Sequence, residues 1–176
     1  MKELTLDEKT KLYAKLKFFI GDNINFLLKD KSFFLHHKRV LLVPNNLIKY
    51  MSSIPKDNIV YAGTVIGKFT KSEKFRICVS GIRVLSQYAI NKVWIKNSAE
   101  MNFLYGNNAL KSHIYRLSEN IPINSGVFVY NQADVCLGYG ICAVKPEKYP
   151  EAKGYQLTVI RQGDNGEYLR SEKDIA

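Results

Sequence analysis

The stretch GVFVYNQADVCLGYGICAV, residues 126–144, decides the fold of the C-terminal half. Two apolar runs flank the polar turn 131–134, which is the pattern of a β-hairpin. Side chains alternate between the faces of a strand, so the glycines of the return strand share one face and its larger residues the other. The first face carries Gly138 and Gly140, and the second carries Leu137, Tyr139 and Ile141. The glycine face is bare, so another strand or a sugar-phosphate backbone could approach it closely.

The net charge of the chain is +10, and all of this excess lies in its first half. Residues 1–93 hold 17 Lys and Arg against 7 Asp and Glu, whereas residues 94–176 hold 9 of each kind. A basic half is typical of proteins that bind nucleic acid, with an anionic membrane surface as the alternative. No run reaches the ~18 apolar residues of a membrane span. Three cysteines in apolar runs indicate a reduced, intracellular protein.

The first half predicts an α/β domain with a mostly antiparallel sheet and flanking helices. Thr5 and Glu8 have the spacing of a capping box, and Gly21 suits the end of the helix that follows. Alternation and turn residues predict the other elements. These are a hairpin over 32–43, a helix after Pro44, strands over 59–66 and 75–79, a helix over 84–90 and a strand over 93–95.

The second half predicts a short helix over 99–103 followed by strands, so the whole chain is α+β. We place the domain boundary near Lys92–Lys96, which divides the chain into 1–93 and 94–176. No Gly- or Pro-rich linker marks it, so we expect the two halves to pack tightly. We expect Trp94 to be a core or interdomain plug rather than a platform for stacking bases.

Motifs of catalysis are missing from the sequence. Gly63–Lys68 has three residues between its glycines, and Phe69 follows the lysine, so it fails the phosphate-loop pattern. No glycine-rich dinucleotide fingerprint, Cys-x-x-Cys or His-Glu-x-x-His motif occurs. We therefore expect no catalytic residue, no metal and no cofactor.

A basic loop between two apolar strands is the best candidate for binding. It carries Lys68, Lys71, Lys74 and Arg76. Such a cluster attracts phosphates with little preference for sequence. The alternative is an edge hairpin that its lysines keep soluble. We favour contact with RNA.

Candidates in the second half follow Gly106, which allows close approach of a backbone. They are Lys111, Ser112, His113 and Arg116, with Arg161 as a weaker one. For His113 a structural role is the better interpretation. Lys111 and Arg116 could clamp phosphates. Tyr105 could stack on a base, but core packing is at least as good an interpretation.

The spacing of the hairpin over 126–144 resembles a PUA domain, a small β pseudo-barrel that binds RNA. Longer blocks give a more specific resemblance, in the order GKFTKSEKFRICVSG, YAINKVWIK, FLYGNNALKSHIYRLSEN and GVFVYNQADVCLGYG, with GEYLR near the end. In this order and at this length they resemble the eukaryotic Nip-seven family, PUA-containing factors for assembly of the large ribosomal subunit.

This resemblance implies an N-terminal α/β domain, a C-terminal PUA domain and no enzymatic activity. It implies binding of precursor ribosomal RNA and the pre-large-subunit particle, and location in the nucleus and nucleolus, with the cytoplasm as a further site. An rRNA methyltransferase-type factor and exosome components are the implied protein partners. We expect no membrane association, and a monomer outside the particle.

Because residues 94–176 are neutral, we hypothesise an RNA surface shared by both halves. The first half would supply Lys68, Lys71, Lys74 and Arg76, and the second would supply shape with Lys111 and Arg116. Two other classes of function stay open: an RNA-modifying enzyme subunit that carries a PUA domain, and a protein–protein adaptor whose basic half meets acidic partners.

Overall fold

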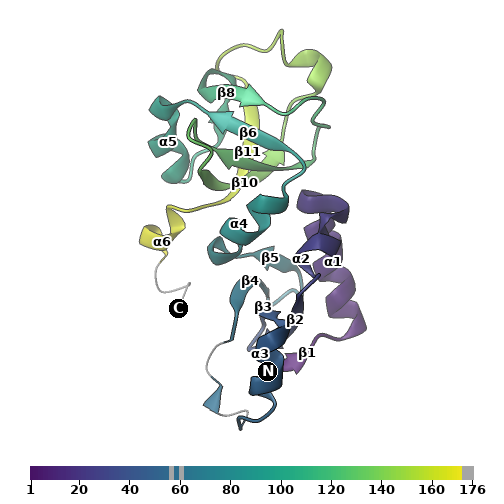
Figure 1. Cartoon of the computed structure of the whole chain (residues 1–176). Coiled ribbons are helices and arrows are strands. Elements are labelled where there is room, and N and C mark those ends of the chain that lie inside the picture. The colour runs from purple at the N-terminus through teal and green to yellow at the C-terminus, as the bar shows by residue number, and fades with distance from the viewer. Residues whose placement is uncertain (56–57, 60–61, 172–176) are drawn as a thin grey trace.

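The computed structural model describes residues 1–55, 58–59 and 62–171, and it places a five-stranded sheet beside a six-stranded one with helix α4 between them (Figure 1). The first sheet and its helices comprise β1 (Lys2–Glu3), α1 (Leu6–Ile20), α2 (Ile24–Leu27), β2 (Lys31–His36), β3 (Arg39–Pro44), α3 (Asn45–Met51), β4 (Thr64–Phe69), β5 (Phe75–Ile77) and α4 (Val79–Leu85). The second comprises β6 (Lys92–Ile95), α5 (Asn97–Leu104), β7 (Ala109–Leu110), β8 (Ile114–Leu117), β9 (Gly126–Tyr130), β10 (Cys136–Cys142), β11 (Leu157–Asp164) and α6 (Glu167–Arg170).

The N-terminal sheet is an antiparallel meander in which β1 to β5 lie in sequence order. Helix α1 begins with the predicted capping box: the Glu8 N–H donates to the Thr5 hydroxyl, and the Thr5 N–H donates to the Glu8 carboxylate. Its apolar stripe is fully buried, and the helix ends at Gly21 as predicted.

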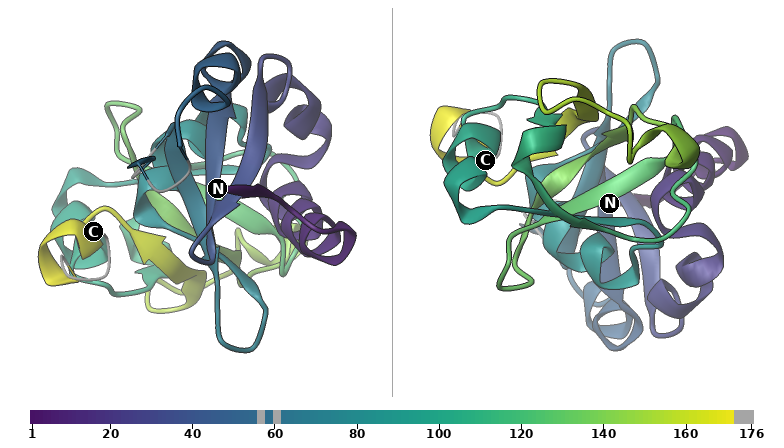
Figure 2. Two further views of the ribbon diagram at one scale, coloured as in Figure 1. Left: turned by 90° about the horizontal axis from the view of Figure 1, so that it is seen from below. Right: turned by 90° about the horizontal axis from the view of Figure 1, so that it is seen from above.

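The C-terminal sheet curls into a nearly closed barrel with the order β7-β11-β10-β9-β6-β8. Strands β6 and β9 run parallel and the other neighbours run antiparallel. Figure 2 looks along the line that joins the sheet to the barrel. The mixed α+β architecture expected from the sequence is confirmed, and the predicted boundary between residues 93 and 94 falls inside β6.

Three predicted elements have different bounds. The helix expected over 84–90 starts at Val79, and a 3-10 turn over Ser86–Tyr88 follows it, so the strand before it ends at Ile77. Close packing against β4 explains the early start, because a Cβ on Gly81 would lie 2.5 Å from the carbonyl oxygen of Ile66. The strand expected over 59–66 is observed from Thr64; Val60 and Tyr61 lie outside the described residues.

A β-bulge changes the faces of β10. The register with β9 shifts between Cys136 and Gly138, so two successive residues point to the same side. Leu137 packs inside the barrel, whereas Tyr139 packs in the core that the barrel shares with α1 and α4. The expectation that Leu137 shares a face with Tyr139 and Ile141 is therefore wrong.

The bare glycine face of β10 is filled by protein. A Cβ on Gly138 would lie 2.3 Å from the Gly163 carbonyl oxygen, and one on Gly140 would lie 2.4 Å from that of Ile160. These carbonyls belong to β11, the hydrogen-bonded neighbour of β10 in the sheet, and the nearest side chains are Phe103 beside Gly138 and Val159 beside Gly140, both in the core of the barrel. Close packing within the barrel therefore explains the two glycines.

The two sheets share one apolar core. Phe128, Tyr130 and Tyr139 leave the outer face of the barrel and pack among the buried residues of α1 and α4. The ring of Phe19 lies 5.7 Å from Phe128 and 5.3 Å from Tyr139. The buried Tyr139 hydroxyl donates to the Ile77 carbonyl at 2.9 Å. The halves are packed tightly, as the missing linker predicted. No helix in the described ranges is long and apolar enough to cross a membrane.

Candidate nucleic-acid interface

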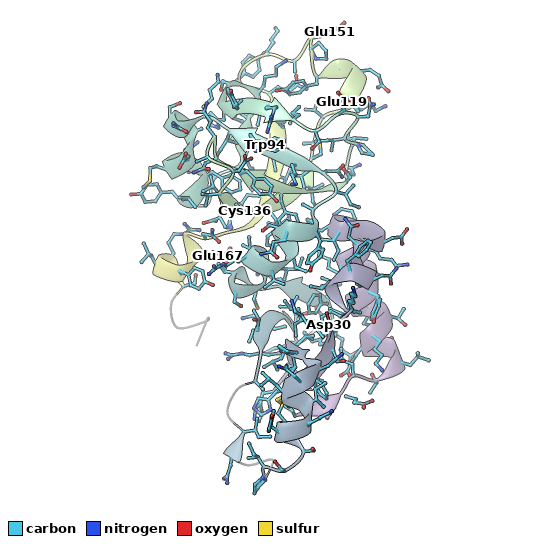
Figure 3. All side chains as sticks on the ribbon, viewed as in Figure 1. Asp30, Trp94, Glu119, Cys136, Glu151 and Glu167 are labelled. Atoms are coloured by element: carbon cyan, nitrogen blue, oxygen red, sulfur yellow. The ribbon has the colours of Figure 1, made fainter. Side chains whose placement is uncertain are left out.

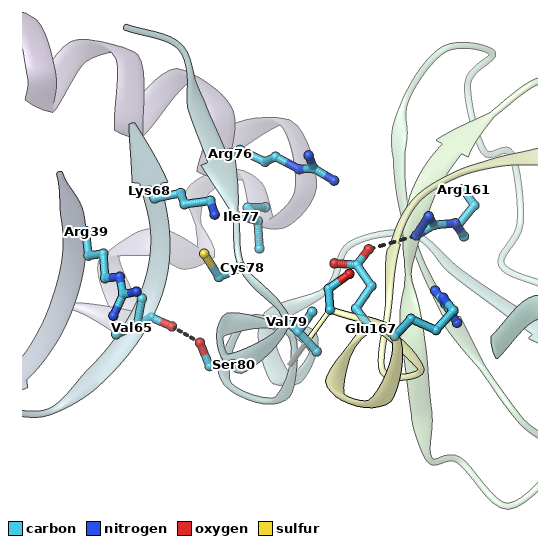
Figure 4. A pocket seen from close by; sticks show the side chains of 12 residues that line it. Arg39, Val65, Lys68, Arg76, Ile77, Cys78, Val79, Ser80, Arg161 and Glu167 are labelled. Atoms are coloured by element: carbon cyan, nitrogen blue, oxygen red, sulfur yellow. Dashed lines mark hydrogen bonds and ion pairs between the residues drawn. The ribbon is translucent and has the colours of Figure 1, made fainter. Parts of the chain in front are cut away.

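A cationic cavity of about 250 Å³ lies at the junction of the sheet and the barrel (Figure 4). Strands β3, β4 and β5 supply one wall, α4 supplies the floor, and β11 with α6 supplies the opposite wall. We call it the junction cavity; the charged residues that line it are Arg39, Lys68, Arg76, Arg161, Glu167 and Arg170.

Three of these cations form a row across neighbouring strands. Arg39 is the register partner of Lys68, and Lys68 is the partner of Arg76. Directly opposed residues of an antiparallel pair have Cβ atoms about 4.5–5.5 Å apart on one face. The other face carries Phe75 and Ile77, which are buried against α1. The row therefore points its charges at the barrel, and Figure 4 shows Arg76 extending toward Arg161.

The barrel wall holds its two arginines with carboxylates. Asp164 is fully buried, and its Oδ2 lies 2.8 Å from both Arg161 Nη1 and Arg170 Nη2. Arg161 also pairs with Glu167 at 2.8 Å and donates from Nε to the Gly106 carbonyl at 2.9 Å. Arg170 donates to the Leu104 carbonyl. These contacts fix α6 to the barrel and keep both guanidinium groups at the rim of the cavity.

The charge balance of the junction cavity is positive. Among the described residues that line it, five are Lys or Arg and one, Glu167, is acidic, with Asp164 behind it. In the described part of the chain no ion pair is formed by Lys68 or Arg76. The volume of the junction cavity is somewhat below the ~300–1,000 Å³ of pockets that hold drug-sized ligands. A cavity of this size suits one phosphate group of a longer polyanion.

The lining also includes one thiol, on Cys78, and two hydroxyls, on Ser80 and Ser171. Burial raises the pKa of the Cys78 thiol above its ordinary value, although the nearby Lys68, Arg39 and Arg76 oppose this shift. The thiol therefore stays protonated near neutral pH and is a poor nucleophile. The Ser80 hydroxyl donates to the Val65 carbonyl at 2.7 Å.

The basic loop predicted from the sequence is divided by the structure. Lys68 and Arg76 line the junction cavity, whereas Lys71 and Lys74 are exposed around the β4–β5 turn. That turn leans on α1, where Glu73 pairs with Lys11 at 3.2 Å. Sequence reasoning missed Arg39 and Arg170, because only the pairing of β3 with β4 and the fold of α6 bring them to the cavity.

The other predicted residues lie away from the cavity. The ammonium of Lys111 donates to the backbone carbonyls of Tyr149 and Pro150, and it sits 4.1 Å from the Tyr149 ring centroid. The backbone carbonyl of Ser112 accepts a hydrogen bond from Lys96 Nζ. Arg116 lies on β8, with its guanidinium 3.9 Å from the ring of Trp94. A role for any of the eight predicted residues in RNA binding stays a prediction.

Comparison with known proteins gives matches along nearly the whole chain. Residues 1–79 match the family model of the NIP7/UPF0113 pre-PUA domain, and residues 91–173 match that of the UPF0113 PUA domain. The 60S ribosome subunit biogenesis protein NIP7 of Saccharomyces cerevisiae is 39% identical, and the NIP7 homolog of Xenopus laevis is 40% identical, each over 99% of both chains.

Two archaeal structures share the fold over the full length. A hypothetical protein from Pyrococcus horikoshii OT3 has a TM-score of 0.60 at 16% identity and covers 98% of both chains. A conserved PUA domain protein from Thermoplasma acidophilum has a TM-score of 0.56 at 13% identity, over 97% of both chains. The barrel is thus of the PUA type.

The chain belongs to the NIP7 family, as its sequence blocks predicted.

Proposed function

We propose that this chain is a non-catalytic RNA-binding factor for assembly of the large (60S) ribosomal subunit and for processing of its precursor RNA. The names of the full-length relatives support this role. The single structural observation that carries RNA binding is the row Arg39, Lys68 and Arg76, which faces Arg161 and Arg170 across the junction cavity.

The RNA surface is shared by both halves of the chain. The neutral barrel presents two arginines whose charges are partly balanced by Asp164 and Glu167. The cations of the sheet add the excess that attracts a polyanion. This arrangement suits contact with the phosphate backbone, which gives affinity without reading base sequence.

A non-catalytic role is supported by the chemistry of the cavity. Its one thiol, Cys78, has a pKa raised by burial, so it lacks the thiolate of a nucleophilic cysteine. Two serines line it, Ser80 and Ser171, and Ser80 donates its proton to the Val65 carbonyl rather than to a base. These contacts disfavour the alternative of an RNA-modifying enzyme subunit.

The partners that follow from this role are precursor rRNA, the pre-large-subunit particle and other assembly factors, including an rRNA methyltransferase-type factor and exosome components. Such assembly takes place in the nucleus and nucleolus, which is where we place the chain. Chromatography of the purified chain would show whether it is a monomer outside the particle.

The test uses the full chain, because the halves share a core and neither is complete alone. We compare Lys68→Gln/Arg76→Gln with the matched control Lys145→Gln/Lys148→Gln, which removes the same charge from exposed positions on the barrel. Affinity for a precursor rRNA transcript is measured at several salt concentrations. Each phosphate contact adds roughly 0.7–0.9 to the slope of log K against log salt, so the first variant should lose about 1.5 from it.

The control variant should change the slope by much less. Equal losses in both variants would mean that the whole positive surface attracts RNA and that the junction cavity is not the site. A wild-type chain without affinity for the transcript would refute the proposed function itself.

A further inference from the structure

A second hollow, of about 860 Å³, lies next to the junction cavity. We call it the Trp94 cleft; its charged and aromatic lining is Arg83, Lys92, Trp94, Arg116, Tyr130, Asp134 and Tyr168. Val79 lines both hollows, and α6 contributes Glu167 and Arg170 to the first and Tyr168 at the edge of the second. Figure 3 places Trp94 on the barrel and Glu167 on α6 below it. The two hollows are therefore neighbours along the junction.

A row of flat groups crosses the outer face of the barrel in this cleft. Trp94 is the register partner of Arg116 on β8 and of Tyr130 on β9. The Arg116 guanidinium lies 3.9 Å from the Trp94 ring centroid, and the Tyr130 ring lies 5.8 Å away with an interplanar angle of 30°. Trp94 Nε1 donates to Asp134 Oδ1 at 2.5 Å. The indole is thus held in place on three sides.

The two ends of this row differ. At the inner end the Tyr130 hydroxyl is buried and donates to the Ser86 carbonyl at 2.7 Å. At the outer end Arg116 is exposed and sits on β8, the edge strand of the sheet as far as the structure describes it. Trp94 is half-buried and packs against the core that the two halves share, which agrees with the expected interdomain plug, and Tyr130 is buried in that core. The row therefore ends in an exposed guanidinium plane that is already oriented.

The charge of the cleft selects the kind of ligand. Arg83, Lys92 and Arg116 line it against one carboxylate, Asp134, and that carboxylate is engaged by the indole. An aromatic site for a cationic ligand would need the opposite balance. Unstacked bases of single-stranded RNA stack on aromatic rings and on arginine planes, and their phosphates need cations nearby. The cleft offers both.

We propose that the Trp94 cleft holds one unstacked base of single-stranded RNA, which stacks on the outer face of the Arg116 guanidinium and extends the row Tyr130–Trp94–Arg116. Arg83 and Lys92 contact the neighbouring phosphates, and the same strand continues into the junction cavity. The inference rests on the proposed RNA binding, and it gives Arg116 a role as a stacking plane rather than as a phosphate clamp.

The test compares Arg116→Lys with Lys148→Arg in the full chain. Arg116→Lys keeps the charge and removes the plane, and Lys148→Arg is a charge-neutral control at an exposed position. Affinities are measured for a single-stranded RNA 12-mer and for inorganic polyphosphate, which has the charge without bases. We expect Arg116→Lys to bind the RNA roughly tenfold more weakly, as loss of one stacked base predicts, and to bind polyphosphate as the wild type does. The control should match the wild type for both.

A spectroscopic readout separates stacking from a structural effect. The chain has a single tryptophan, so its fluorescence reports on this cleft alone. We expect the RNA 12-mer to change Trp94 emission and polyphosphate to leave it unchanged. The stacking site would be overturned if the wild type bound RNA without a change in Trp94 emission and Arg116→Lys bound RNA as tightly as the wild type. The proposed RNA binding would still stand in that case. Equal competition by polyglutamate would assign the cleft to an acidic peptide. Absence of any RNA binding by the wild type would refute the proposed function first.

Discussion

Replacement of Asp164 by asparagine should destabilise the barrel end that carries α6. The Asp164 carboxylate is fully buried and lies 2.8 Å from Arg161 and from Arg170, whose side chains are 21% and 32% exposed. Removing one partner of a buried ion pair costs about 3–5 kcal/mol because the other charge is left without compensation. Here the two arginines reach some water and asparagine keeps one acceptor oxygen, so we expect a loss of about 3 kcal/mol in the free energy of unfolding.

The measurement is urea denaturation followed by Trp94 fluorescence. With a slope of about 2 kcal/mol per molar urea, the midpoint should fall by roughly 1.5 M. The matched control is Asp7→Asn, which breaks an exposed pair with Lys11 at 2.6 Å and should barely move the midpoint. Equal shifts in the two variants would show that the buried network does not hold α6. Asp164→Asn should also weaken RNA binding, since Arg161 and Arg170 lose their fixed positions at the junction cavity.

Two further predictions concern the core. Gly81→Ala should lower stability by roughly 2 kcal/mol in thermal unfolding, because the new Cβ would lie 2.5 Å from the Ile66 carbonyl oxygen, and this clash outweighs the better helix propensity of alanine. The control Gly154→Ala should be neutral, because the nearest atom to its new Cβ is 3.6 Å away. A neutral Gly81→Ala would refute close packing as the reason for the helix start. Burial raises the pKa of Tyr139 to about 12, so the unfolded chain releases this proton first and stability should fall as pH rises from about 10 toward 12, by up to about 1.4 kcal/mol per pH unit. Tyr139→Phe should be less stable than the wild type at pH 8, because it loses the hydrogen bond to the Ile77 carbonyl. Its urea midpoint should nevertheless fall less steeply as the pH rises from about 10 toward 12, and an unchanged dependence of the midpoint on pH would contradict the raised pKa of Tyr139.

Local signals in the sequence were sufficient for much of the fold. The Thr5–Glu8 capping box, the hairpin over 32–43 and the hairpin after Gly126 depend on residues near one another, and the structure confirms each. The start of α4 was missed because it depends on contact of Gly81 with Ile66, fifteen residues earlier. The bulge at Cys136 was missed because alternation assumes an unbroken register.

The candidate site divides in the same way. Lys68 and Arg76 were found because they flank one turn, so their cross-strand pairing is local. Arg39 reaches the same row only through pairing of β3 with β4, which a long intervening segment hides from the sequence. The ammonium of Lys111 donates to the carbonyls of Tyr149 and Pro150, and no local pattern signals that contact; its role at phosphates stays a prediction.

The shared core has a consequence for anything that binds along the junction. Because Phe128, Tyr130 and Tyr139 are inserted among the residues of α1 and α4, the barrel cannot rotate against the sheet without exposing these rings to water. The distance between Trp94 and the row Arg39, Lys68 and Arg76 is therefore fixed. For the RNA binding that we propose, a flexible strand that spans both hollows has to adopt this spacing itself, and we expect a stiff duplex to bind more weakly.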